Sequence, residues 1–280
     1  MIKNILMPQD GSDYSSAALL YGLWLAKRFR AGLTGLHVVD IVALEGPFIR
    51  DISGSMGVEP YLNFSAKMRE VLEAKGAEIL DSFKESCGRE GVECDAQSAF
   101  GIVANEICEK ARTADLIVMG RHGVNERYEH GLLGSITEAV VRKSQRPVFV
   151  TPKAFKEPRK PLLAYDGSPG AAKAMHSAAQ FAKELGLPLT VISVSTPGSG
   201  ADSIHDATHY LKPYALNAHY EQIPAPSGEA PAVIDKYYKE NGHDLLFMGA
   251  THHSRLMELV LGSTAERLMR AAAGPLFIER

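Results

Sequence analysis

The chain has 280 residues, of which 45% are hydrophobic and 22% charged, with a formal net charge of −3. This composition predicts a folded globular protein of about two domains and argues against a long disordered segment. The weakly acidic balance excludes nucleic acid and anionic membranes as expected partners, because both require a basic surface.

Short apolar runs and amphipathic segments alternate along the first half. Four runs bounded by turn residues predict buried strands, at residues 4–8, 34–39, 116–120 and 146–150. Helical spacing of apolar residues predicts helices over 15–29 and 64–87, and Ser12 and Asp13 can begin the first of them. Strands separated by helices of this length imply right-handed βαβ crossovers and a parallel sheet with helices on both faces.

The second half of the chain repeats the first. Residues 6–39 align without a gap on residues 162–195, residues 116–120 on 245–249, and residues 132–150 on 260–278. The first copy carries about 27 extra residues, which we assign to the segment 41–66, and the polar residues 153–160 form the linker. We therefore predict two Rossmann-like α/β domains, 1–152 and 158–280, each with a mainly parallel five-stranded sheet and helices on both faces.

The start of the chain and its cysteines bear on localisation. Pro8 and Asp10 precede any apolar run of signal-sequence length, and no stretch approaches the roughly 18 apolar residues of a membrane span. The three cysteines, Cys87, Cys94 and Cys108, lie at spacings that match neither a zinc site nor a C-x-x-C redox pair. We expect a cytoplasmic protein with reduced thiols.

Parallel sheets of this type bind ligands beyond the carboxyl ends of their strands, and both copies carry Asp-Gly-Ser there. Asp10 and Asp166 follow the first strand of their copies. Such an aspartate most often only ends a strand and begins the next helix. The alternative is a carboxylate at the rim of a nucleobase or ribose pocket.

A glycine-bounded loop leads into the last helix of each copy, over residues 120–135 and 249–263. Glycine lets backbone N–H groups approach a phosphate, and a helix N-terminus attracts negative charge, so each loop predicts an anion site. The serine that closes each loop also begins an S-x-x-E sequence, which ends at Glu138 or Glu266. We therefore expect a capping box at both helices, with or without a ligand.

Taken in order, these motifs resemble the universal stress protein (UspA) family: Asp-Gly-Ser, His-Val after the second strand, Met-Gly after the fourth, a glycine loop, Gly-Ser and a final Pro-Val-Phe-Val strand. The resemblance covers nearly the whole chain as two tandem copies of an adenine nucleotide alpha hydrolase-like fold. It implies a G-x2-G-x9-G-[S/T] loop that cradles the phosphates of ATP or AMP, with or without Mg²⁺, and strand-end contacts to adenine and ribose. By position, the implied cofactor-binding residues are Asp10, Val38, Gly120, Gly123, Gly134, Ser135 and Ile136 in the first copy, and Asp166, Val194, Gly249, Gly262, Ser263 and Thr264 in the second.

Both copies depart from this loop pattern. The first has Gly120 and Gly123 but ten residues before Gly134, whereas the second keeps nine residues but has His252 in place of the second glycine. A side chain at that position crowds the phosphate space, so we favour the first copy as the binding site.

Other polar residues give weaker signals. Arg121, His122 and Arg127 could neutralise phosphate charge, although basic loop residues are more often only solvated. His205 and His209 lie one helical turn apart and could hold a metal with His252 or His253. Most such pairs are surface histidines, so we predict no metal site.

Three functions follow from these residues. The first is a tandem stress protein that binds an adenine nucleotide and signals to an unknown protein partner; the second is a nucleotide-free scaffold or a carrier of another small ligand. The third is a slow ATP hydrolase: the sequence has no conventional hydrolase motif, but a neutral imidazole at His122 or His130 could orient water. We expect the two halves to pair like a homodimer through the final strands at 147–150 and 275–278, and further dimerisation of the whole chain is compatible with the sequence.

Overall fold

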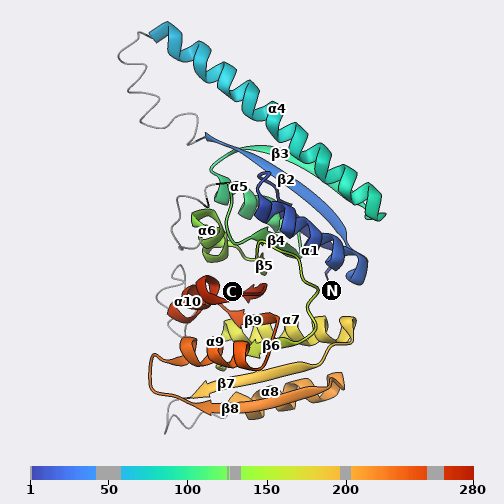
Figure 1. The fold of residues 1–280 in the computed structure, drawn as a ribbon, viewed down its shortest axis with the longest axis vertical. Helices are drawn as coiled ribbons and strands as arrows, with labels where there is room; N and C mark the ends of the chain where they lie inside the picture. The colour runs from blue at the N-terminus through green and yellow to red at the C-terminus, as the bar shows by residue number, and fades with distance from the viewer. Residues whose placement is uncertain (1, 42–57, 125, 127–133, 196–202, 251–261) are drawn as a thin grey trace.

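The computed structural model describes residues 2–41, 58–124, 126, 134–195, 203–250 and 262–280, with the backbone alone over 58–66. The described residues form one ten-stranded sheet with helices on both faces (Figure 1). Its strand order is β3-β2-β1-β4-β5-β10-β9-β6-β7-β8, so each half contributes five neighbouring strands. Strands within each half pair in parallel, which confirms the predicted fold class.

The strands of the two halves correspond in order. Those of the first half are β1 (Asn4–Pro8), β2 (Gly32–Asp40), β3 (Cys94–Gly101), β4 (Leu116–Gly120) and β5 (Val148–Thr151). Those of the second half are β6 (Pro161–Ala164), β7 (Leu189–Ser195), β8 (Ala218–Pro224), β9 (Leu245–Gly249) and β10 (Leu276–Glu279). Each of the four apolar runs predicted as strands is confirmed. β3 has no such run, because it lies at the sheet edge and its side chains alternate between exposed and half-buried positions.

Two sets of helices cover the sheet. One face carries α1 (Asp13–Phe29), α4 (Val58–Glu90), α7 (Pro169–Leu185) and α8 (Ser203–Leu211), together with the short helix η3 (Lys212–Tyr214). The other carries α5 (Val103–Lys110), α6 (Ser135–Lys143), α9 (Ala230–Glu240) and α10 (Ser263–Ala271), with the short helix η1 (Ala111–Thr113) after α5. Ser12 caps α1, since its Oγ accepts a hydrogen bond from the Ser15 N–H at 3.1 Å, so the predicted helix start is confirmed. None of the described helices is long and apolar enough to cross a membrane.

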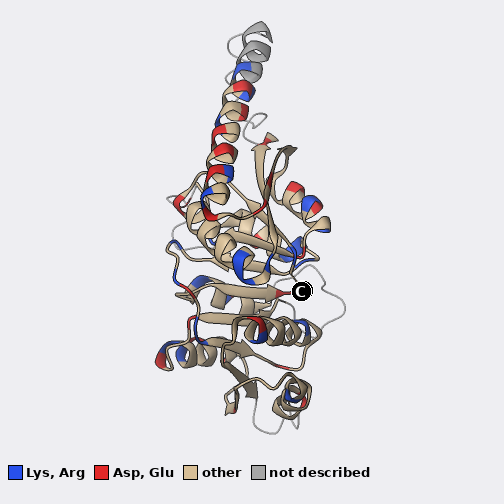
Figure 2. Ribbon diagram, turned by 90° about the vertical axis from the view of Figure 1, so that its right-hand side faces the viewer, with Lys and Arg blue, Asp and Glu red and all other residues tan. Residues whose placement is uncertain are grey.

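Helix α4 contains much of the extra length of the first copy. It has 33 residues, whereas its counterpart α8 has 9. Its N-terminal part projects beyond the sheet (Figure 1), and charged residues of both signs follow one another along the rest of the helix (Figure 2). Residues 58–63, which the assigned insertion 41–66 included and the predicted helix 64–87 did not, are its first turns, and residues 42–57 lie outside the described part of the chain.

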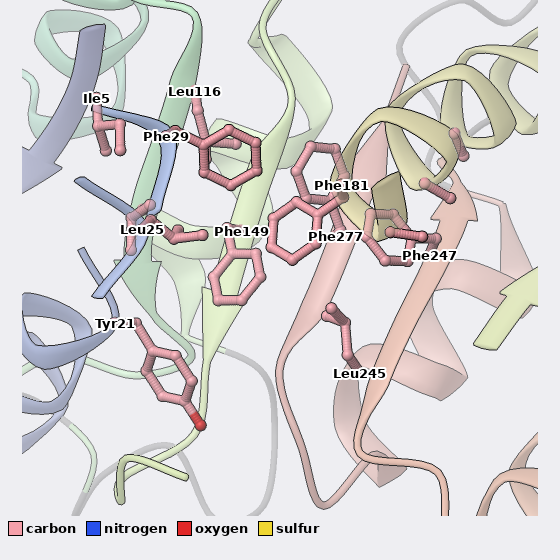
Figure 3. Close-up of a cluster of buried hydrophobic side chains, with 14 of the residues drawn as sticks. Ile5, Tyr21, Leu25, Phe29, Leu116, Phe149, Phe181, Leu245, Phe247 and Phe277 are labelled. Carbon is pink, nitrogen blue, oxygen red and sulfur yellow. The ribbon is translucent and has the colours of Figure 1, made fainter. Parts of the chain in front are cut away.

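The two halves join through β5 and β10, which pair antiparallel with Phe149 opposite Phe277. Both rings are buried, and their centroids lie 6.2 Å apart in an edge-to-face arrangement. Phe181 of α7 and Phe247 of β9 complete an aromatic cluster that crosses the join (Figure 3). The predicted pairing of the final strands is confirmed, and burial of these rings stabilises it.

The linker between the halves packs against α1. The Lys156 N–H donates to the Tyr21 hydroxyl at 3.1 Å, and the Trp24 Nε1–H donates to Glu157 at 3.2 Å. At its far end, the Asp244 carboxylate accepts hydrogen bonds from the backbone N–H groups of Arg159 and Lys160. These contacts fix the path of the linker, although its sequence is polar.

Candidate functional site

The carboxyl ends of β1, β2 and β4 surround a cavity of about 250 Å³ in the first half. Every residue that the sequence assigned to a first-copy site lines it: Asp10, Val38, Gly120, Gly123, Gly134, Ser135 and Ile136. These residues come from three strand ends and from the start of α6, so the sheet topology brings them together. We call this space the first cavity.

Asp10 fastens the glycine loop to the end of β1. Its Oδ1 accepts a hydrogen bond from the Ser12 N–H at 2.9 Å, and its Oδ2 accepts one from the Val124 N–H at 3.0 Å. Both interpretations of this aspartate therefore have support, because it shapes the turn before α1 and also lines the first cavity. Each carboxylate oxygen has a second lone pair that can accept a further hydrogen bond.

Two glycines are required where the loop passes close to its neighbours. A Cβ on Gly120 would lie 2.6 Å from the Tyr14 Cβ, and a Cβ on Gly123 would lie 2.5 Å from Asp10 Oδ2. Ordinary side chains at these positions would push the loop away from α1 and from the aspartate. The glycines thus set the position of the loop, and with it the width of the cavity.

The predicted capping boxes are wrong in both halves. Gly134 and Gly262 occupy the N-cap positions, which puts the serines one residue inside their helices. The two glutamates instead pair with arginines one turn later, Glu138 with Arg142 and Glu266 with Arg270. Glycine has no side chain to accept a hydrogen bond, so neither Gly134 nor Gly262 bonds the first N–H groups of its helix through a side chain.

Arg121 does not serve the cavity. Its Nη1 donates to the Ala272 carbonyl at 2.6 Å and its Nη2 to the Gly274 carbonyl at 3.1 Å, at the C-terminal end of α10 in the other half. Burial of the guanidinium lowers the pKa of Arg121. Neither alternative for this residue, a charge toward phosphate or a solvated loop position, agrees with these contacts, because the guanidinium is directed at the second half. Arg127 lies outside the described residues.

His122 and Tyr14 meet at the loop. Their rings lie 5.1 Å apart in an edge-to-face arrangement, and His122 lines the first cavity. The Tyr14 hydroxyl donates to Glu126, whose other oxygen accepts from Lys153 at 3.0 Å. Burial and the neighbouring Glu126 raise the pKa of Tyr14. This network anchors the loop to α1 and to the linker.

The sequence analysis missed the wall of the first cavity that α4 provides. Leu72 and Lys75 of this helix line the cavity, as does His37, whose Nδ1 lies 2.8 Å from the Gln9 carbonyl. α4 lies very close to β2 at this point: a Cβ on Gly76 would lie 2.4 Å from the His37 ring, so only glycine fits there. The helical spacing predicted α4, but only the fold shows which of its turns crosses the strand ends.

The second half has a cavity of about 280 Å³ in the corresponding place. Its lining includes Asp166, Val194, Gly249, Gly262 and Thr264, whereas Ser263 is exposed and is not part of the lining. This second cavity is walled mainly by small and aliphatic side chains. His252, which occupies the position of the second loop glycine, lies outside the described residues.

The second cavity shares one feature with the first and differs from it in another. A Cβ on Gly249 would lie 2.6 Å from the backbone nitrogen of Ala171, so the start of α7 packs on the end of β9 as the start of α1 packs on the end of β4. Tyr165 occupies the place of Gln9 and lines the cavity, and burial with two nearby carboxylates raises its pKa. The two halves thus present cavities of different chemistry.

Metal ligands do not gather in the described part of the chain. No group of three or more His, Cys, Asp or Glu side chains there is arranged to hold a metal ion. His205 and His209 both belong to α8, as their spacing predicts, while His253 lies outside the described residues.

Comparison of the sequence with known proteins identifies its family. The sequence model of the universal stress protein family matches residues 1–152 and 225–280. Universal stress protein Slr1230 of Synechocystis is 28% identical over 287 residues, which covers 100% of both chains. Universal stress protein MJ0531 of Methanocaldococcus jannaschii is 35% identical over 160 residues, covering 56% of this chain and 86% of its own.

Solved structures agree on the fold. A universal stress protein from Archaeoglobus fulgidus superposes with a TM-score of 0.75 at 23% identity, covering 99% of this chain and 96% of its own. A universal stress protein from Pseudomonas aeruginosa gives 0.64 at 18% identity, over 99% and 93% of the two chains. Because the family model covers more than half of its length, the chain belongs to the universal stress protein family.

Proposed function

We propose that the first cavity binds an adenine nucleotide, ATP or AMP, and that the protein acts in a stress response through this site. The observation that carries the proposal is that all seven residues assigned to the first copy from sequence line one cavity beyond the strand ends. An arrangement reached by chance would have left some of them elsewhere in the fold. In the second copy, by contrast, Ser263 does not line the cavity, although its neighbours Gly262 and Thr264 do.

The phosphates belong at the glycine end of this cavity. Gly134 begins α6, and Ser135, Ile136 and Thr137 of its first turn line the cavity. The first N–H groups of a helix attract an anion through the helix dipole, and a glycine cap leaves them accessible. The ammonium group of Lys75 adds positive charge to the lining.

The nucleoside belongs at the opposite end, between the ends of β1 and β2. Val38 offers an apolar surface for a base, and Asp10 retains acceptor capacity for a ribose hydroxyl while it holds the loop. Binding of a nucleotide here would therefore depend on Asp10 in two ways: Asp10 contacts the ribose, and its hydrogen bond to the Val124 N–H holds the loop.

The decisive experiment is calorimetric titration of ligand-stripped protein with ATP and AMP. Gly134→Val and Gly262→Val form a matched pair, because both glycines have extended backbones that valine tolerates and both begin the corresponding helix. We expect one nucleotide per chain, at least about tenfold weaker binding in Gly134→Val, and unchanged affinity in Gly262→Val. Absence of binding at millimolar nucleotide would overturn the proposal.

Slow hydrolysis of the bound nucleotide is a second candidate, favoured by the position of His122 in the lining. An imidazole ring can orient a water molecule, and the contact with the Tyr14 ring holds the His122 side chain in place. Release of phosphate by wild-type protein should then fall in His122→Ala while nucleotide affinity is retained. Equal rates in the two proteins would remove His122 from this role.

A different ligand for the second cavity is the remaining candidate. Its described lining contains no basic residue and has a tyrosine at the place of Gln9, which favours a less charged molecule than a nucleotide. Mass spectrometry of freshly purified, denatured protein would identify a resident ligand. A second equivalent of nucleotide, lost in Gly262→Val, would contradict this assignment.

A further inference from the structure

Two cysteine thiols of the first half meet at the turn between α4 and β3. Cys87 lies in the last turns of α4 and is completely buried, whereas Cys94 begins β3 and is half-buried. The Cys94 side chain lies close enough to the Cys87 thiol to raise its pKa, although six residues separate the two in the sequence. This contact was not foreseen from their spacing.

The local backbone fixes this contact. Gly91 ends α4 with a φ of 64°, the Gly91 N–H donates to the Gly88 carbonyl at 3.2 Å, and the Val92 N–H donates to the Cys87 carbonyl at 3.0 Å. These two bonds form a Schellman motif, in which a left-handed glycine turns the chain back onto the last helical turn. The turn therefore brings the residues that follow it against Cys87.

Strand pairing then orients the second thiol. Cys94 pairs with Leu33 of β2, and the Leu33 N–H donates to the carbonyl of the preceding Glu93 at 3.0 Å. Val92, just before the strand, and Cys94 both pack against the apolar cluster that contains Cys87. A helix cap and a strand register thus hold the two sulfurs together independently.

We propose that Cys87 and Cys94 form a reversible intramolecular disulfide when the protein meets a hydroperoxide. The Cys94 thiolate attacks a peroxide oxygen, the O–O bond breaks, and Cys94 becomes a sulfenic acid with release of water or an alcohol. The Cys87 sulfur then attacks the Cys94 sulfur, the S–S bond forms, and the hydroxyl group leaves as water with the Cys87 proton. A dithiol or two equivalents of a monothiol reverse the reaction.

The order of the two steps follows from burial. Burial and the neighbouring Cys94 side chain raise the pKa of the Cys87 thiol to about 12, which suits a resolving thiol better than the first nucleophile. Cys94 is the more accessible sulfur. All three cysteines of the chain lie in the first half, so this chemistry belongs to the half with the nucleotide cavity, and α4 carries both Cys87 and the cavity residue Lys75.

The test uses the full-length Cys108→Ser variant. Trypsin cleaves after Lys84, Arg89 and Lys110, so residues 85–89 and 90–110 then carry one cysteine each. After treatment with hydrogen peroxide and blocking of free thiols, we expect most of the protein to lose the mass of two hydrogen atoms and to yield these two peptides linked. Dithiothreitol should restore both thiols.

Single variants in the same background test the order of reaction. In Cys87→Ser, a sulfenic acid at Cys94 should accumulate and be trapped by dimedone, whereas in Cys94→Ser the remaining thiol should stay unmodified. The proposal is overturned if peroxide leaves both thiols of the Cys108→Ser protein free, links two chains, or oxidises Cys94 further without linkage. These measurements use no nucleotide, so they stand whether or not the first cavity binds one.

Discussion

Arg121 is expected to stabilise the join between the halves, and Arg121→Ala tests this. The guanidinium comes from the glycine loop of the first half and donates to the carbonyls of Ala272 and Gly274, at 2.6 and 3.1 Å. These carbonyls lie just beyond the C-terminal end of α10, where a cation is favoured by the helix dipole. The substitution removes both hydrogen bonds and leaves the two acceptors without this partner.

The expected loss follows from the hydrogen bonds and from the cost of burial. A hydrogen bond to a charged group contributes about 1.5–3 kcal/mol, so two contribute about 3–6 kcal/mol. Burial of the guanidinium, which lowers the pKa of Arg121, offsets roughly half of this sum. We therefore expect the free energy of unfolding to fall by about 1.5–3 kcal/mol. Arg121→Lys should recover only part of this loss, because an ammonium group cannot span both carbonyls.

Urea denaturation of Arg121→Ala, followed by circular dichroism, measures this loss. Arg112→Ala is the matched control, because the Arg112 guanidinium is exposed and pairs with Glu109 on the surface, and it should change the free energy of unfolding by less than about 1 kcal/mol. If Arg121→Ala is as stable as Arg112→Ala, the guanidinium contacts contribute nothing and the reasoning is refuted.

Three further predictions concern the join, pH and the first cavity. Phe277→Ala should lower the free energy of unfolding by about 3–5 kcal/mol in urea titrations, because it empties the centre of the buried aromatic cluster; a loss below about 1 kcal/mol would contradict this. Burial lowers the pKa of His243 from its ordinary 6.5, so the folded protein holds it neutral. The stability that comes from keeping His243 neutral is fully present above pH 6.5 and is lost as the pH falls through the lowered pKa of the folded protein. In His243→Gln, the urea midpoint of unfolding should therefore fall less steeply as the pH is lowered. If the first cavity binds a nucleotide, Lys75→Ala should weaken the binding measured by calorimetry by about three- to tenfold and more at low salt, whereas Lys84→Ala, on the same helix, should have no effect.

Most of the fold could be predicted from the sequence repeat and the apolar runs. Buried parallel strands are continuous apolar runs, so β1, β2, β4 and β5 could be located from the sequence, and the repeat then supplied their counterparts. β3 was expected as one of five strands but could not be placed, because an edge strand needs only one apolar face. The full length of α4 was not predicted, because its first turns project beyond the sheet, where a helix does not need a regular apolar face.

The candidate site was predicted in its residues but not in all of its contacts. Strand ends and glycines identify the lining, because topology alone brings strand ends together. The destination of Arg121 depends on a carbonyl 151 residues away, which no local pattern encodes. The capping boxes failed for a local reason, since Gly134 and Gly262 took the cap positions that the motif assigns to serine.

The covalent link between the halves changes what the antiparallel β5–β10 join can become. Two separate identical chains joined in this way would carry the same residue on both sides of the axis and could exchange partners. In one chain, the linker keeps the two halves at a high effective concentration, so β5 and β10 pair even where their residues differ. Arg121 reaches across the join while Ala250, at the equivalent strand end, does not carry a charge. The duplication has thus made a symmetric contact directional, with one half reaching into the other.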